Sequence, residues 1–169
     1  MRHINFFDMK ILYLHGYNGK PNKKRIKYLE DLGHEVIAPY IDYNNEPNIF
    51  IELIELEYEC IIGNSLGGYL AFYISKYKSI KAICINPPLH TDLKINIIIP
   101  NTKELPIQKP CSVILGMEDE VVKPKKVIDW LIHNKPYCDL HVYDGVGHKY
   151  SINNFIKMIN PIINKCSEY

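Results

Sequence analysis

A Gly-x-Ser-x-Gly motif is the strongest chemical signal in the chain. It runs from Gly63 to Gly67 with Ser65 at its centre, between the apolar run Tyr58–Ile62 and a segment with apolar residues at helical spacing. A sharp turn from strand to helix raises a serine hydroxyl above a sheet, where it can act as a nucleophile. The two glycines are needed because the backbones flanking the serine crowd one another. The N-terminus of the following helix would stabilise a negative oxygen beside Ser65.

His148 is the expected base for this serine. It follows the segment Gly145–Gly147 after the last strand-like run and opens the final helical segment. A glycine-containing loop of this kind can carry an imidazole over the serine turn. His15 is the alternative, but a histidine that closes a strand usually bonds loop backbone and holds a turn. We therefore assign proton transfer to His148 and a structural role to His15.

An acid that orients the base is expected just past another strand end. Asp119 lies three residues after Gly116 and two before a Val-Val pair, which fits the usual acid turn. The neighbours Glu118 and Glu120 compete for this role, since acidic turns at helix starts also occur for capping alone. Asp92, after an earlier strand, is a further alternative. We predict Asp119.

Two backbone N–H groups complete the predicted chemistry. Gly16 allows a sharp turn after the first strand, so the N–H of Tyr17 can face the serine. Together with the N–H of Leu66, it would form a two-donor oxyanion hole. We expect no metal ion and no organic cofactor, because this apparatus requires neither and the five cysteines show no zinc spacing.

Bulk properties narrow the class of protein. The 169 residues predict a single domain over 1–169, and a net charge of +1 gives no argument for nucleic acid or a membrane surface. The cysteines are expected to be buried thiols of a reducing compartment, and the start lacks the apolar core of a signal peptide, so we expect a cytoplasmic protein. One basic run is expected to be the exposed face of a helix. Its members are Lys20, Lys23, Lys24, Arg25 and Lys27.

Short apolar runs alternate with amphipathic ones along the chain. This alternation predicts an α/β fold in three layers, a minimal six-stranded, mainly parallel sheet with helices on both faces. Pro161 is expected to strain or end the last helix. The stretch 87–110 has no clear assignment, although its isoleucines suggest packing. The predicted strands are Lys10–His15, His34–Ala38, Tyr58–Ile62, Ala82–Ile85, Ser112–Leu115 and Asp139–Tyr143; the predicted helices are Asn22–Leu32, Asn48–Leu56, Leu66–Lys76, Pro124–Asn134 and Tyr150–Asn164.

The order Ser65, Asp119, His148 is the chain order of the α/β hydrolases. The chain resembles this superfamily and, more narrowly, the small bacterial YqiA-like esterases. The resemblance implies Ser65 as nucleophile, Asp119 as acid, His148 as base and the N–H groups of Tyr17 and Leu66 as oxyanion donors. The chain departs from the fuller members in two ways: we expect two edge strands to be absent, because it begins at what would be their third strand, and the segment after Asn86 is short relative to lipases with large caps. The matching stretches are Ile11–Asn18, Gly63–Tyr69, Ile85–Pro87, Gly116–Val122, Gly147–His148 and Phe155–Ile163.

These observations predict a serine hydrolase that cleaves carboxylic esters or acyl thioesters through an acyl-enzyme. The expected partner is a small-molecule substrate of short to medium acyl chain, without nucleic acid or membrane; the sequence does not indicate an oligomeric state. The alternative is an inactive hydrolase fold that serves as a binding or interaction protein, because a fold does not fix a function.

Overall fold

The computed structural model describes residues 8–102 and 104–163 as alternating strands and helices. All eleven predicted elements are present, with ends shifted by a few residues at most. In chain order they are β1 (Lys10–Leu14), α1 (Lys23–Asp31), β2 (Glu35–Ile37), α2 (Ile49–Glu55), β3 (Cys60–Asn64), α3 (Leu66–Lys78), β4 (Lys81–Ile85), β5 (Cys111–Gly116), α4 (Pro124–Asn134), β6 (Asp139–Tyr143) and α5 (Ile152–Ile163).

The strands form one sheet in the order β2-β1-β3-β4-β5-β6. Every neighbouring pair is parallel; Leu12 of β1, for example, pairs with Ile61 of β3. The predicted parallel sheet is thus confirmed and is parallel throughout its described strands. The chain moves outward from β1 to β2 and then continues from β3 in the opposite direction. Ligands of open α/β sheets bind at such a reversal, beyond the carboxyl ends of the strands.

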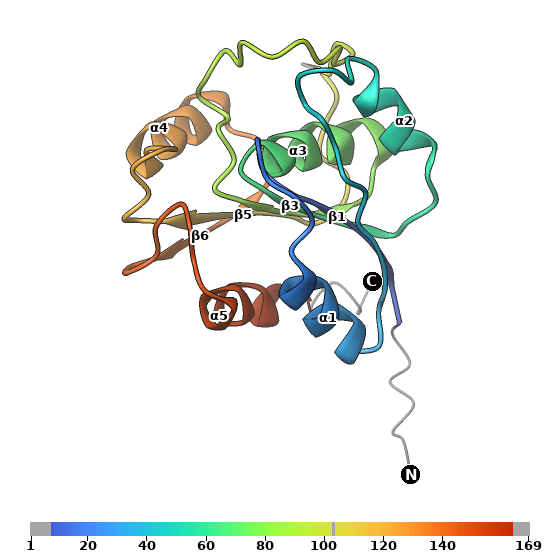
Figure 1. Ribbon diagram of the computed structural model, residues 1–169. Coiled ribbons are helices and arrows are strands. Elements are labelled where there is room, and N and C mark those ends of the chain that lie inside the picture. The colour runs from blue at the N-terminus through green and yellow to red at the C-terminus, as the bar shows by residue number, and fades with distance from the viewer. Residues whose placement is uncertain (1–7, 103, 164–169) are drawn as a thin grey trace.

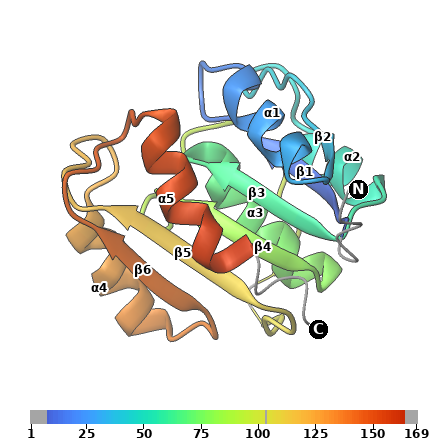
Figure 2. The same ribbon diagram turned by 90° about the horizontal axis from the view of Figure 1, so that it is seen from below.

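Helices cover both faces of the sheet. Figure 1 shows α2, α3 and α4 on one face and α1 and α5 on the other, and Figure 2 shows the second pair lying across the sheet. Two apolar clusters fill the spaces between these layers. Phe50, Phe72 and Val127 belong to the first cluster, and Leu29 and Phe155 to the second. Each fully buried side chain of this size contributes about 1.5–3 kcal/mol to folding.

The helix starts follow local rules, but one predicted helix end does not. The side chain of Asn22 accepts hydrogen bonds from the N–H groups of Lys24 and Arg25, and Pro124 occupies the first turn of α4. Pro161 does not end α5, which continues to Ile163. A proline inside a helix removes one hydrogen bond to the carbonyl four residues earlier, a cost that packing of the apolar face can outweigh.

The stretch 87–110 crosses the first face without a described helix or strand. Ile95, Ile97 and Ile99 pack against the first apolar cluster, while Ile98 donates its backbone N–H to the carbonyl of Pro47 at 2.8 Å. The expectation that these isoleucines pack is confirmed. Among the described residues, no helix has the length and apolar composition needed to cross a bilayer.

Candidate active site

Ser65 occupies a strained turn between β3 and α3. Its backbone has φ 54° and ψ −119°, and only 9% of the residue is exposed. A serine in this region costs about 1–3 kcal/mol, and such strain persists where the surrounding structure imposes it. The Ser65 N–H donates to the carbonyl of Ile85 at 2.8 Å, and its carbonyl accepts from the N–H of Tyr69 at 2.9 Å. The turn is therefore anchored to β4 and to the first turn of α3.

The two motif glycines are imposed by close backbone contacts. A Cβ added at Gly63 would lie 2.0 Å from the carbonyl oxygen of Gly67, and one added at Gly67 would lie 2.6 Å from the carbonyl oxygens of Leu14 and His15. No side chain fits at either distance. The predicted crowding around Ser65 is confirmed, and β1, β3 and α3 meet at this turn.

Asp119 and His148 form a hydrogen-bonded pair. Nδ1 of His148 donates to Oδ2 of Asp119 at 2.7 Å, while Oδ1 of Asp119 accepts from the N–H groups of Val121 and Val122, both at 2.8 Å. The Asp119 side chain is fully buried, whereas Glu118 and Glu120 are exposed. Because the carboxylate accepts at Nδ1, the other imidazole nitrogen keeps its lone pair. This tautomer suits a general base.

The loop after β1 is held beside Ser65 by His15. Nε2 of His15 accepts the backbone N–H of Ile41 at 3.0 Å, so Nδ1 carries the proton and donates to the carbonyl of Gly16 at 2.8 Å. Burial lowers the pKa of His15, which keeps the ring neutral. The predicted structural role of His15 is confirmed. A Cβ at Gly16 would lie 3.1 Å from Cβ of Ser65, so the backbone leading to Tyr17 passes close to Ser65.

The predicted residues meet at one cleft of about 380 Å³. Ser65, His148 and Tyr17 line it, and Asp119 lies behind His148. Leu66 is the first residue of α3, where a backbone N–H has no partner within the helix. Within residues 8–102 and 104–163, no group of three or more His, Cys, Asp or Glu side chains is arranged to hold a metal ion.

Asn86 has a structural role that sequence reasoning missed. It is 1% exposed, and its Oδ1 accepts the backbone N–H of Gly116 at 2.8 Å while its Nδ2 donates to the carbonyl of Gly147 at 3.4 Å. Its backbone has φ 46°. One amide thus joins the end of β4 to the end of β5 and to the residue before His148. The signal available in the sequence was an Asn between an isoleucine-containing apolar run and a proline.

We expect Asn86→Gly to lower the free energy of unfolding by about 1–3 kcal/mol, because the buried N–H of Gly116 and the partly buried carbonyl of Gly147 lose their partner. Glycine tolerates the positive φ, so backbone strain is not added. Displacement of His148 should also lower kcat for ester hydrolysis by up to about 100-fold. Urea unfolding and steady-state kinetics measure both effects. Exposed Asn96→Gly is the control, and equal behaviour of the two variants would contradict the assignment.

The prediction that the whole basic run is an exposed helix face is wrong for Arg25. Lys23, Lys24 and Lys27 are exposed, but Arg25 is 9% exposed and lines the Ser65 cleft. It lies four residues before buried Leu29 and therefore on the same face of α1. That spacing was the signal available in the sequence.

A family model matches residues 10–104, described as Uncharacterised protein family (UPF0227). The match covers more than half of the chain. The chain belongs to this family. The matched region includes Tyr17, Ser65 and Leu66 and ends before Asp119 and His148. Membership agrees with the YqiA-like resemblance of the sequence.

Solved structures with the same fold are enzymes of the α/β hydrolase type. Monoacylglycerol lipase of Paleococcus ferrophilus superposes with a TM-score of 0.71 at 14% identity, over 94% of this chain and 95% of the lipase. MGS-MChE2, an α/β hydrolase from a lagoon sediment metagenome at Mar Chica, Morocco, gives 0.69 at 21%, over 94% and 91%. Est1E from Butyrivibrio proteoclasticus gives 0.68 at 13%, over 95% and 88%. The predicted α/β hydrolase fold is confirmed.

Proposed function

We propose that this protein is a serine hydrolase of carboxylic esters or acyl thioesters, with Ser65 as nucleophile, His148 as base and Asp119 as the acid that orients the base. The observation that carries the proposal is the Asp119–His148 hydrogen bond of 2.7 Å beside the cleft that contains Ser65. Those three residue types, delivered from the ends of β3, β5 and β6, suit acyl transfer. The similar fold supports this chemistry but does not by itself assign it.

The proposed reaction proceeds in two halves. His148 takes the Ser65 proton as Oγ bonds to the acyl carbon, and the N–H groups of Tyr17 and Leu66 stabilise the resulting oxyanion. The intermediate collapses, the bond to the alcohol or thiol breaks, and His148 returns the proton to that leaving group. Water then attacks the Ser65 ester by the same route and releases the acid. Asp119 keeps His148 in the required tautomer throughout.

The site favours an enzyme over an inactive binding fold. A binding module gains nothing from a serine held at φ 54° or from a fully buried carboxylate bonded to a histidine. Both features cost free energy or restrict the chain, and both serve acyl transfer directly. The competing hypothesis predicts ligand binding without turnover.

A panel of 4-nitrophenyl esters and acyl-CoA thioesters of rising chain length tests the proposal. We expect turnover, with the highest kcat/KM for short to medium acyl groups, because a cleft of about 380 Å³ has little room for a long chain. Initial rates at fixed enzyme concentration measure this, with heat-denatured protein as the control. Absence of turnover across the panel would favour the binding module, and a steep rise toward long chains would contradict the size argument.

A further inference from the structure

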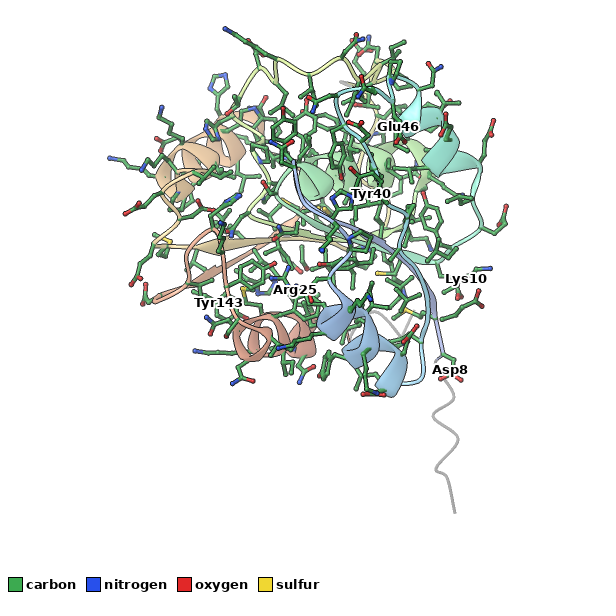
Figure 3. All side chains as sticks on the ribbon, in the orientation of Figure 1. Asp8, Lys10, Arg25, Tyr40, Glu46 and Tyr143 are labelled. Carbon is green, nitrogen blue, oxygen red and sulfur yellow. The ribbon has the colours of Figure 1, made fainter. Side chains whose placement is uncertain are left out.

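Arg25 brings a positive charge into the wall of the proposed catalytic cleft. Its Nη1 donates to the hydroxyls of Tyr13 and Tyr150, both at 3.2 Å, and its Nη2 donates to the carbonyl of Tyr150 at 3.2 Å. The guanidinium carbon lies 4.1 Å from the centre of the Tyr150 ring. Figure 3 shows Arg25 on the side of the sheet that α1 and α5 cover. The guanidinium is therefore held between β1 and the segment that follows His148.

None of these partners neutralises the charge. Burial raises the pKa of Tyr13 and of Tyr150, so both phenols stay protonated at neutral pH. The ion pairs among the described residues are Lys10–Glu35, Lys27–Asp31 and His148–Asp119, and Arg25 belongs to none of them. Burying a charge without a counter-charge opposes folding. Arg25 is thus a buried charge whose described hydrogen-bond partners are all neutral.

The other charged side chains that line the cleft are also positive. Fourteen described residues line it, and none of them is Asp or Glu. Lys20 and Lys149 also line it and are exposed, so they add positive charge near its opening. A concave surface with charges of one sign raises the local concentration of ligands of the opposite sign. The cleft is electrostatically suited to an anion.

A chain of hydrogen bonds links Arg25 to the residue that precedes Ser65. The hydroxyl of Tyr150, which accepts from Arg25, donates to Oδ1 of Asn64 at 2.6 Å, and Asn64 directly precedes Ser65. An arginine has five N–H donors, and Arg25 uses three of them on described partners. The remaining two can meet the two oxygens of a planar carboxylate.

We propose that Arg25 is a specificity-determining residue that binds a carboxylate of the substrate, so that the preferred ester or thioester is negatively charged. The inference rests on the proposed serine hydrolase function. Lys20 and Lys149 assist by attracting the anion into the cleft.

Two matched substrate pairs test the proposal and distinguish the side of the scissile bond that carries the charge. Mono-4-nitrophenyl adipate and its methyl ester differ on the acyl side, whereas 4-acetoxybenzoate and methyl 4-acetoxybenzoate differ in the leaving group. We expect at least about a tenfold higher kcat/KM for the charged member of one pair, and loss of that preference in Arg25→Gln. Lys27→Gln removes an exposed charge from the same helix and should leave the ratio unchanged.

The ratio of kcat/KM between the charged and the uncharged member of a pair distinguishes carboxylate binding from a structural role. A merely structural Arg25 would affect both members alike. Equal kcat/KM for both members of each pair in the parent would overturn the proposal while ester hydrolysis stands. If neither pair is hydrolysed, a calorimetric titration with adipate decides on Arg25, and the proposed function fails only if the panel of 4-nitrophenyl esters and acyl-CoA thioesters is not turned over either. Binding to the parent that is lost in Arg25→Gln supports the carboxylate site, and no binding to the parent overturns it.

Discussion

Replacing Ser65 by alanine is expected to lower kcat for ester hydrolysis by roughly 10⁴- to 10⁶-fold, because the described lining of the cleft contains no other Ser, Thr or Cys that could take its place. The fold should survive, since the backbone contacts of this turn are made by the Ser65 N–H and carbonyl with Ile85 and Tyr69 rather than by its hydroxyl. Steady-state turnover of a 4-nitrophenyl ester and thermal unfolding of the same sample measure both expectations.

Ser79→Ala is the matched control for this variant. Ser79 ends α3 with φ 55°, close to the φ 54° of Ser65, and its hydroxyl contacts only Gln108 among the described residues. The control therefore places alanine at a similar positive φ away from the cleft, although ψ is 50° at Ser79 and −119° at Ser65. It should lower stability slightly and leave turnover intact. Retention of most activity in Ser65→Ala would remove Ser65 from the role of nucleophile.

Asp119→Asn is expected to lower kcat by up to roughly 10⁴-fold. The backbone N–H groups of Val121 and Val122 both donate to Oδ1, so the oxygen of the new amide should keep that position. The amide nitrogen must then face Nδ1 of His148, where it can only donate. The imidazole would have to place its proton on Nε2, which is the nitrogen needed as the base.

Glu118→Gln and Glu120→Gln are the controls for the acid. Both residues are exposed and flank Asp119 in the same turn, so each removes an equal charge without a hydrogen bond to His148. Both should stay within about tenfold of the parent in kcat. Asp92→Asn tests whether the acid comes instead from the segment that follows an earlier strand. A nearly active Asp119→Asn beside an inactive Asp92→Asn would show that the acid had been misassigned.

Much of this fold could be predicted because local patterns and the parallel topology agree. Most strands are short apolar runs, most helices have one apolar face, and most connections are short, which leaves few topologies open. The steric need for Gly63 and Gly67 could also be predicted, since it arises within one turn. In contrast, a rule based on proline alone does not predict the helical conformation of Pro161 within α5.

The contacts of Asp119 and Arg25 depend on residues far away in the sequence. The spacing from Gly116 and to the Val-Val pair favours Asp119 among three consecutive acids, but its hydrogen bond to His148, 29 residues later, cannot be read from that turn alone. Arg25 looked like its lysine neighbours because charge runs are usually exposed. Its partners Tyr13 and Tyr150 lie 12 and 125 residues away, so the site they form with it has no contiguous motif.

Labelling with a fluorophosphonate tests the central claim most directly, because the reagent phosphonylates only a serine that its surroundings have activated. The folded protein should gain the mass of one adduct, located by mass spectrometry on the peptide that contains Ser65. Ser65→Ala and heat-denatured protein should remain unlabelled, and Ser79→Ala should label like the parent. A folded parent protein that stays unlabelled, or that carries the adduct on another residue, would contradict the assignment of Ser65 as an activated nucleophile.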